Sequence, residues 1–158
     1  MNLQDLYQEL IIDHGTHPRN CRTLCNPNCS AKGYNPLCGD SIQLYLSVEQ
    51  EKIIEASFQG SGCAISTASA SLMTEALIGK TLNDAQKLFH QFQILLTTED
   101  STPLDLGKLS ALSGVRAFPM RVKCATLPWH TLNAALKNET KTVVTETIEK
   151  TMIETSNE

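Results

Sequence analysis

The stretch SIQLYLSVE, residues 41–49, decides the fold together with KIIEASFQ, residues 52–59, which follows after a short polar corner. The first run alternates apolar side chains with more polar ones, and its apolar positions are Ile42, Leu44, Leu46 and Val48. The second run alternates through Ile54, Ala56 and Phe58. Such alternation is typical of half-buried strands, and the corner Gln50-Glu51 predicts an antiparallel hairpin. One face of this hairpin is expected to meet the core, and the other to be wetter.

Helical patterns flank this hairpin on both sides. The first residues repeat apolar side chains with helical spacing and predict a helix that ends at His14-Gly15. The following segment, up to Asn35, predicts an irregular loop with a short strand near residues 31–34. After the hairpin, the sequence predicts helices over 63–79, over 82–96 with Thr81 as the cap, over 104–112, and from about Thr126 onward. That last start is expected because Pro128 is tolerated only in a first helical turn.

These elements predict an α+β fold, a small antiparallel sheet with helices packed on one face. The 158 residues fit one domain, which we expect to span 1–138. Residues 139–158 are rich in Thr and Glu and weakly periodic, so they predict a flexible C-terminal tail.

Composition excludes several classes of function. The net charge is −4, which argues against non-specific electrostatic binding to nucleic acid or to an anionic membrane. No apolar run approaches the ~20 residues of a membrane helix, and the N-terminus resembles no signal peptide. We therefore expect a cytoplasmic protein. In a reducing compartment, its six cysteines are expected to serve metal binding or catalysis rather than disulfides.

Three cysteines lie at predicted junctions between elements. Cys38 lies in the turn PLCGD before the hairpin, Cys63 in GSGCA after it, and Cys124 in MRVKCA before the predicted last helix. The last two are therefore expected at or near helix N-termini, where backbone N–H groups and the helix dipole favour a thiolate.

An acidic residue joins this set. Asp40 lies two residues after Cys38, so a bend at Gly39 lets the thiolate and the carboxylate reach one ion. Three thiolates and a carboxylate suit tetrahedral Zn²⁺. Arg121 and Lys123 are available to offset the excess negative charge. The wide spacing alone fits a structural zinc, or three unrelated core thiols, equally well.

The other three cysteines, Cys21, Cys25 and Cys29, recur every four residues within the predicted loop. A second metal or cluster site is one interpretation. We favour three unrelated thiols, because Asn20, Asn26 and Pro27 argue against a regular helix that would present all three on one face.

Several motifs, in order, resemble the NifU N-terminal/IscU/SufU family of iron–sulfur cluster assembly proteins over residues 3–137. The matching stretches are Asp13-His14 with His17-Pro-Arg-Asn20, Pro36-Leu-Cys-Gly-Asp40, Phe58-Gln-Gly-Ser-Gly-Cys-Ala-Ile-Ser66 and Arg121-Val-Lys-Cys-Ala125. Within the family, the chain looks like the zinc-containing SufU branch. Lys123 stands where the scaffold branch carries a His, and residues 117–121 differ from the chaperone-recognition motif of that branch.

The resemblance implies that Cys38, Asp40, Cys63 and Cys124 are the zinc ligands. It also implies that Cys38 accepts sulfur, as a persulfide, from a pyridoxal-phosphate (PLP) cysteine desulfurase. Arg121 matches a basic position that would act at this site or at the interface with the desulfurase. Downstream iron–sulfur assembly proteins are the further partners that the resemblance implies.

Three functions follow as hypotheses. The first is a zinc-dependent sulfurtransferase that accepts sulfur from a cysteine desulfurase and thereby stimulates it. The second is a scaffold that assembles and transfers a [2Fe–2S] cluster on the same residues, because thiolates also ligate iron well. The third is a purely structural zinc with an unrelated interaction role. Asp40 counts against the third, because closed structural zinc sites use Cys and His.

Overall fold

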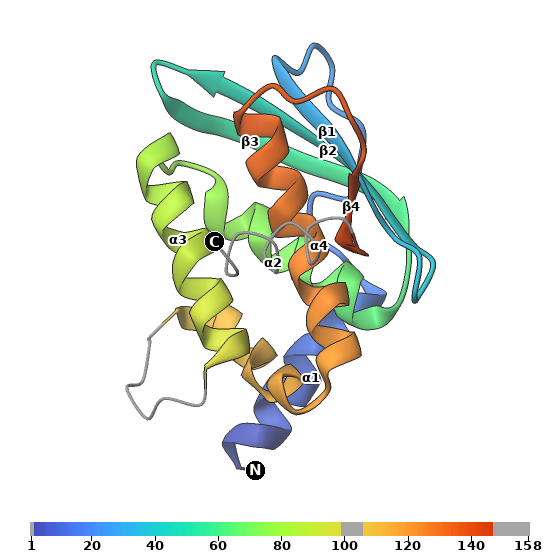
Figure 1. Cartoon of the computed structure of the whole chain (residues 1–158). Coiled ribbons are helices and arrows are strands. Elements are labelled where there is room, and N and C mark those ends of the chain that lie inside the picture. The colour runs from blue at the N-terminus through green and yellow to red at the C-terminus, as the bar shows by residue number, and fades with distance from the viewer. Residues whose placement is uncertain (1, 99–105, 147–158) are drawn as a thin grey trace, which may run out of the picture.

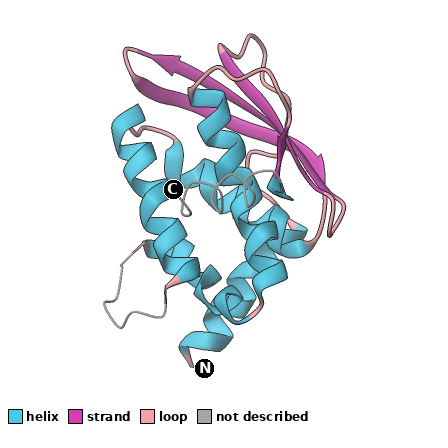
Figure 2. Ribbon diagram, in the orientation of Figure 1, coloured by secondary structure: helices cyan, strands magenta, loops and turns pink. Residues whose placement is uncertain are grey.

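The structure, a computed structural model, describes residues 2–98 and 106–146. A four-stranded sheet in the order β3-β2-β1-β4 carries the helices on one of its faces (Figures 1 and 2). This arrangement confirms the predicted α+β class. The elements are α1 (Leu3–Thr16), β1 (Cys29–Asn35), β2 (Asp40–Glu49), β3 (Lys52–Ser61), α2 (Ala64–Leu77), α3 (Leu82–Thr97), the 3-10 helix η1 (Gly107–Ala117), α4 (Pro119–Leu136) and β4 (Val143–Val144).

The predicted hairpin is present as β2 and β3, with a β-bulge inside it. Its corner uses Gln50 and Glu51 at positive φ of 51° and 62°, the left-handed conformation that a tight two-residue hairpin turn requires. Val48 pairs with Ile53, whereas Ser47 pairs with Glu55, so Ile54 is the extra residue of the bulge. The bulge shifts the alternation by one position. Ile53 is fully buried and Ile54 is 41% exposed, which corrects the predicted inward position of Ile54.

The C-terminal segment extends the sheet at the other edge. β4 pairs with Gly33 and Tyr34 of β1 in parallel, so the sheet is mixed rather than antiparallel throughout. Thr145, directly after β4, is only 5% exposed. These contacts involve residues 143–145, which lie in the first part of the predicted tail, 139–158. Two neighbouring valines are too short a run to give a strand signal. The rest of the predicted tail, residues 147–158, lies outside the described part of the chain.

The small residues of α2 allow its neighbours to approach closely. Its Ala and Ser side chains are mostly buried, and α1 and α4 pack against it. The hydroxyl of Ser69 donates to the carbonyl of Ala125 in α4 and accepts a hydrogen bond of 3.2 Å from the indole N–H of Trp129. The predicted cap of α3 is confirmed, because the Thr81 hydroxyl accepts a hydrogen bond of 3.1 Å from Asp84 N–H.

The last helix begins earlier than predicted. α4 starts with Pro119 in its first turn, where a missing N–H costs nothing, and continues through Pro128. Proline inside a helix costs about 3 kcal/mol. The helix around Pro128 lies in the core, where fully burying Leu127 and Trp129 contributes about 1.5–3 kcal/mol each. Burial therefore outweighs the local penalty, and the predicted start at Thr126 is wrong.

The helix predicted over 104–112 is observed from Gly107, as η1, and continues to Ala117. The first residues of that prediction lie outside the described ranges. Between the sheet and α2, α3 and α4 lies one apolar core, in which the rings of Phe92 and Trp129 stack 4.7 Å apart. Of the helices in the described residues, none has the length and apolar character needed to cross a membrane.

Candidate metal centre

A tight turn between β1 and β2 presents the first cysteine. The N–H of Gly39 donates to the carbonyl of Asn35 at 2.9 Å, and Gly39 has a φ of 71°, which favours glycine. The turn leaves Cys38 half-buried and places Asp40, the first residue of β2, fully inside the protein. The bend predicted at Gly39 is therefore present, and it brings the two side chains to the same side.

Three predicted ligands meet at this turn. One ligand atom from each of Cys38, Asp40 and Cys124 lies within 4.8 Å of the others. Sγ of Cys124 donates to Sγ of Cys38 at 3.2 Å. Ligands of a tetrahedral zinc ion, each about 2.0–2.3 Å from the metal, lie roughly 3.5 Å apart. Soft sulfurs with one carboxylate oxygen at this spacing fit Zn²⁺, and they fit iron as well.

Hydrogen bonds hold the carboxylate of Asp40 in place. Its Oδ1 accepts from the backbone N–H of Cys63 at 2.8 Å, and its Oδ2 accepts from Nδ2 of Asn35 at 3.2 Å. A carboxylate has about four lone-pair positions, so both oxygens keep acceptor capacity for a metal. Gly62 leaves the necessary space, because a Cβ there would lie 2.6 Å from Oδ1 of Asp40.

The fourth predicted ligand lies beside the other three. Cys63 is the N-cap of α2, as predicted, and its sulfur accepts a hydrogen bond of 3.4 Å from Ser66 N–H. Its sulfur is outside the group within 4.8 Å, but its backbone contacts Asp40 directly. The structure therefore gathers Cys38, Asp40 and Cys124 and places Cys63 next to them.

Cys124 lies in a different position from the predicted one. It is inside α4 rather than before a helix, so the argument from the helix dipole applies to Cys63 and not to Cys124. Burial, followed by hydrogen bonds with Cys38 and Asp40, raises the pKa of the Cys124 thiol. The neutral thiol is therefore favoured until a cation binds, because a coordinated thiol is deprotonated.

Arg121 supplies positive charge at the rim. It lies on α4 one turn before Cys124, and its side chain is exposed. A hydrogen bond to Cys124, together with the nearby sulfurs of Cys63 and Cys38, raises the pKa of Arg121. The guanidinium thus lies close to the sulfurs whose negative charge it is predicted to offset.

One site residue was missed by sequence reasoning. Asn35 is fully buried and contacts both Asp40 and Cys124. It directly precedes Pro36-Leu-Cys-Gly-Asp40, so its place beside that motif is the signal that could have revealed it.

The remaining cysteines form no such site. Cys21 and Cys25 are exposed and Cys29 is half-buried, and all three are free thiols. Over residues 2–98 and 106–146, the group at Cys38 is the one place where three His, Cys, Asp or Glu ligand atoms converge. The interpretation of three unrelated thiols is the one that the geometry favours.

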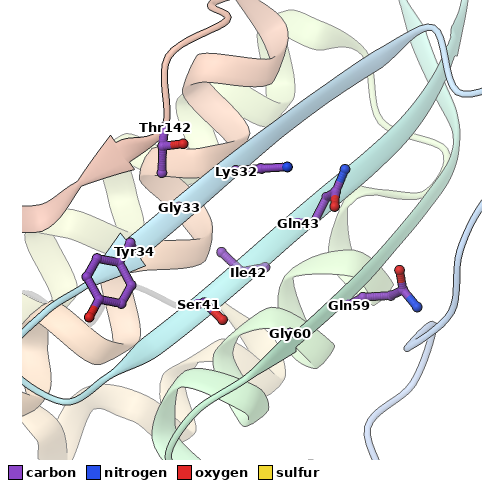
Figure 3. A pocket seen from close by; sticks show the side chains of 9 residues that line it. All are labelled: Lys32, Gly33, Tyr34, Ser41, Ile42, Gln43, Gln59, Gly60 and Thr142. Atoms are coloured by element: carbon purple, nitrogen blue, oxygen red, sulfur yellow. The ribbon is translucent and has the colours of Figure 1, made fainter.

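A groove of about 360 Å³ lies on the sheet, and no cysteine lines it. Its lining residues come from β1, β2 and β3 and include Thr142, just before β4, and the helices lie behind the sheet (Figure 3). Its walls carry Lys32, Tyr34, Gln43 and Gln59, and none of the predicted site residues lines it. The groove is therefore separate from the candidate metal centre.

Comparison with known proteins identifies the family of this chain. The family model described as NifU-like N terminal domain matches residues 6–145. The zinc-dependent sulfurtransferase SufU of Bacillus subtilis (strain 168) is 39% identical, over 87% of this chain and 94% of its own. The iron–sulfur cluster assembly scaffold protein IscU of Streptococcus pyogenes serotype M1 is 38% identical, over 85% of each chain.

A solved structure supports the same assignment. The putative iron–sulfur cluster assembly scaffold protein for the SUF system from Fervidobacterium islandicum AW-1 matches with a TM-score of 0.77 and 34% identity. The match covers 85% of this chain and 99% of that one. This chain therefore belongs to the NifU-like N-terminal domain family of iron–sulfur cluster assembly proteins.

Proposed function

We propose that this chain is a zinc-dependent sulfurtransferase that accepts persulfide sulfur from a PLP-dependent cysteine desulfurase and thereby stimulates it. One observation carries the proposal: Cys38 reaches the surface, while Asp40 and Cys124 lie buried within 4.8 Å of it. This arrangement offers a reactive thiol to a partner and keeps ligand atoms behind it. The SufU relative, named a zinc-dependent sulfurtransferase, supports the same function.

Cys38, Asp40, Cys63 and Cys124 are the proposed zinc ligands. Zinc, when bound, would keep the Cys38 sulfur as a thiolate, which is the form that reacts with persulfides. Asp40 is the one oxygen ligand among sulfurs. Asn35 and the Cys63 N–H hold it against the site.

The proposed reaction is a thiol–persulfide exchange. The Cys38 thiolate attacks the terminal sulfur of the desulfurase persulfide, and a new S–S bond forms on Cys38. The S–S bond of the donor breaks, and the donor cysteine leaves with the electron pair as a thiolate that takes up a proton. No net oxidation occurs, because one persulfide replaces another. Arg121, at the rim, is positioned to stabilise the thiolates as they exchange.

The surface around the site suits a protein partner. Leu37, next to Cys38, is 46% exposed, and Phe118 and Met120, at the start of α4, are 63% and 58% exposed. Large apolar side chains gathered around a reactive residue favour docking of another protein. We propose that the desulfurase binds here, and that iron–sulfur assembly proteins downstream receive the sulfur.

The test measures sulfide release from cysteine by the organism's own desulfurase under limiting reductant. Wild-type protein is expected to raise the rate strongly, and Cys38→Ser to abolish that rise. Cys25→Ser is the matched control, because Cys25 is an exposed thiol outside the site. A Cys38→Ser variant that stimulated as well as wild type would defeat the proposal.

A second function is favoured by the relatives named IscU scaffold proteins. In it, the same thiolates hold a [2Fe–2S] cluster that is built and handed on. Anaerobic reconstitution with iron and sulfide separates the two. A stable cluster together with no stimulation of the desulfurase would favour the scaffold.

A further inference from the structure

Asn35 is a polar side chain with no access to water, and all of its polar atoms are used. It is the last residue of β1 and is fully buried. Its amide nitrogen Nδ2 donates to Oδ2 of Asp40 at 3.2 Å and to Sγ of Cys124 at 3.6 Å. One amide group therefore contacts two of the proposed ligands, which come from β2 and from α4.

The amide of Asn35 can point only one way. Its neighbours on the ligand side are a carboxylate and a sulfur, which accept hydrogen bonds in their charged forms. Reversing the amide would turn its oxygen toward the Asp40 carboxylate and replace two attractions by a repulsion. The side-chain oxygen of Asn35 must therefore face away from the ligands, and it needs a donor there.

The C-terminal segment supplies that donor. The hydroxyl of Thr145 donates to Oδ1 of Asn35 at 3.0 Å. Thr145 is 5% exposed and follows β4, which pairs with β1 directly beside Asn35. The hydrogen bond joins residues 110 positions apart in the sequence. A residue far from the cysteine motifs thus fixes the orientation of the amide that contacts them.

We propose that Asn35 is a positioning residue of the metal site and that Thr145 holds it in its working orientation. This inference rests on the proposed function, because it concerns the zinc ligands named there. Two N–H donors directed at a carboxylate and a thiolate offset part of the excess negative charge of the ligand set. They also fix the directions of the two ligands before metal binds. Partners of this kind typically change metal affinity by about 10–100-fold.

The experiment compares the zinc affinity of the full-length protein and its variants by competition with a chromophoric chelator. Asn35→Asp keeps the shape but removes both donors, and it is expected to weaken zinc binding by about 10–100-fold. Thr145→Val removes only the hydroxyl and is expected to weaken it by roughly two- to tenfold. Thr145→Ser keeps the hydroxyl, so its zinc affinity should equal that of wild type. Thr142→Val, an exposed change in the same segment, is the matched control.

A second readout separates positioning from general stability. Each protein is loaded with Co²⁺, and the sulfur-to-cobalt charge-transfer band is recorded. A hydrogen bond to a thiolate lowers the energy of the sulfur lone pair, so Thr145→Val should move this band to longer wavelength. A purely structural effect of Thr145 would lower the unfolding temperature without moving the band.

The outcomes are distinct. If Asn35→Asp fails to fold, the comparison of zinc affinity and of the cobalt band between Thr145→Val and Thr145→Ser is sufficient to test the inference. Thr145→Val with wild-type affinity and an unmoved band overturns the inference, and so does an equal loss in Thr145→Ser or Thr142→Val. A wild-type protein that bound no zinc would instead overturn the proposed function, and this inference with it.

Discussion

The carboxylate of Asp40 and the backbone N–H of Cys63 are joined by a hydrogen bond of 2.8 Å. Asp40 begins β2, and Cys63 caps α2, so this bond fixes the start of a strand to the start of a helix. The short approach requires a residue without a side chain just before Cys63. Gly62 meets that requirement, because a Cβ there would collide with Oδ1 of Asp40.

Gly62→Ala is expected to lower zinc affinity by about 10–100-fold, because the new methyl group must displace the carboxylate. Chelator competition on the purified protein measures this. Gly114→Ala is the matched control, since a Cβ at Gly114 meets nothing within 4 Å. Equal affinities for the two variants would show that the position of Asp40 is unimportant.

The C-terminal boundary can be tested by truncation. A chain that ends at residue 138 loses β4 and the Thr145–Asn35 hydrogen bond. We expect its unfolding temperature to fall by about 3–8 °C. A chain that ends at Glu146 keeps every contact described for this segment and serves as the control. The measurement is the thermal unfolding midpoint of the two truncated chains. Equal midpoints would show that the domain ends at residue 138.

The docking surface can be weakened without touching the ligands. Replacing Phe118 and Met120 by Ala removes exposed apolar area beside the site. The concentration needed for half-maximal stimulation of the desulfurase should rise roughly thirtyfold, because each of the two lost contacts contributes on the order of 1 kcal/mol. Ile78→Ala is the control, since Ile78 is 43% exposed at the opposite end of α2 from Cys63. Zinc affinity should not change in either variant, and a loss of zinc would contradict a docking role.

Acid is expected to destabilise the protein through His130. Burial lowers the pKa of His130 from 6.5 to about 4, and its ring lies edge-on to Phe89 at 5.2 Å. His130 is therefore protonated below about pH 6.5 in the unfolded chain, but only below about pH 4 in the folded chain. The contribution of neutral His130 to stability is complete above pH 6.5 and is lost as the pH falls from 6.5 toward 4.

His130→Leu should remove the part of the pH dependence of stability that comes from His130. Between pH 7 and pH 5, we expect the free energy of unfolding of wild type to fall by roughly 2 kcal/mol more than that of the variant. Urea unfolding of both metal-free proteins at several pH values provides the comparison. Parallel pH dependences would rule out His130 as the acid-sensitive group.

The hairpin and the cysteine turns could be predicted from sequence because their signals are local. Alternation between residues 42 and 48 needs only one buried face to become a strand, and β2 is observed there. Glycines beside Cys38 and Cys63 mark turns for reasons of backbone geometry alone. The motif residues Cys38, Asp40 and Cys124 were predicted from chemistry and resemblance, and the fold brings them together.

The sequence by itself thus determined the hairpin, most of the helices and the identity of the candidate ligands, but not β4. Tertiary packing determined the structure at positions where it outweighed the local preference of the sequence. α4 runs through Pro128 because its residues are buried in the core, and the bulge at Ile54 turns Ile53 inward. Asn35 and Thr145 meet across 110 positions, a contact that no local pattern encodes. Long-range contacts form only when the whole chain is folded, because they depend on burial that distant segments provide together.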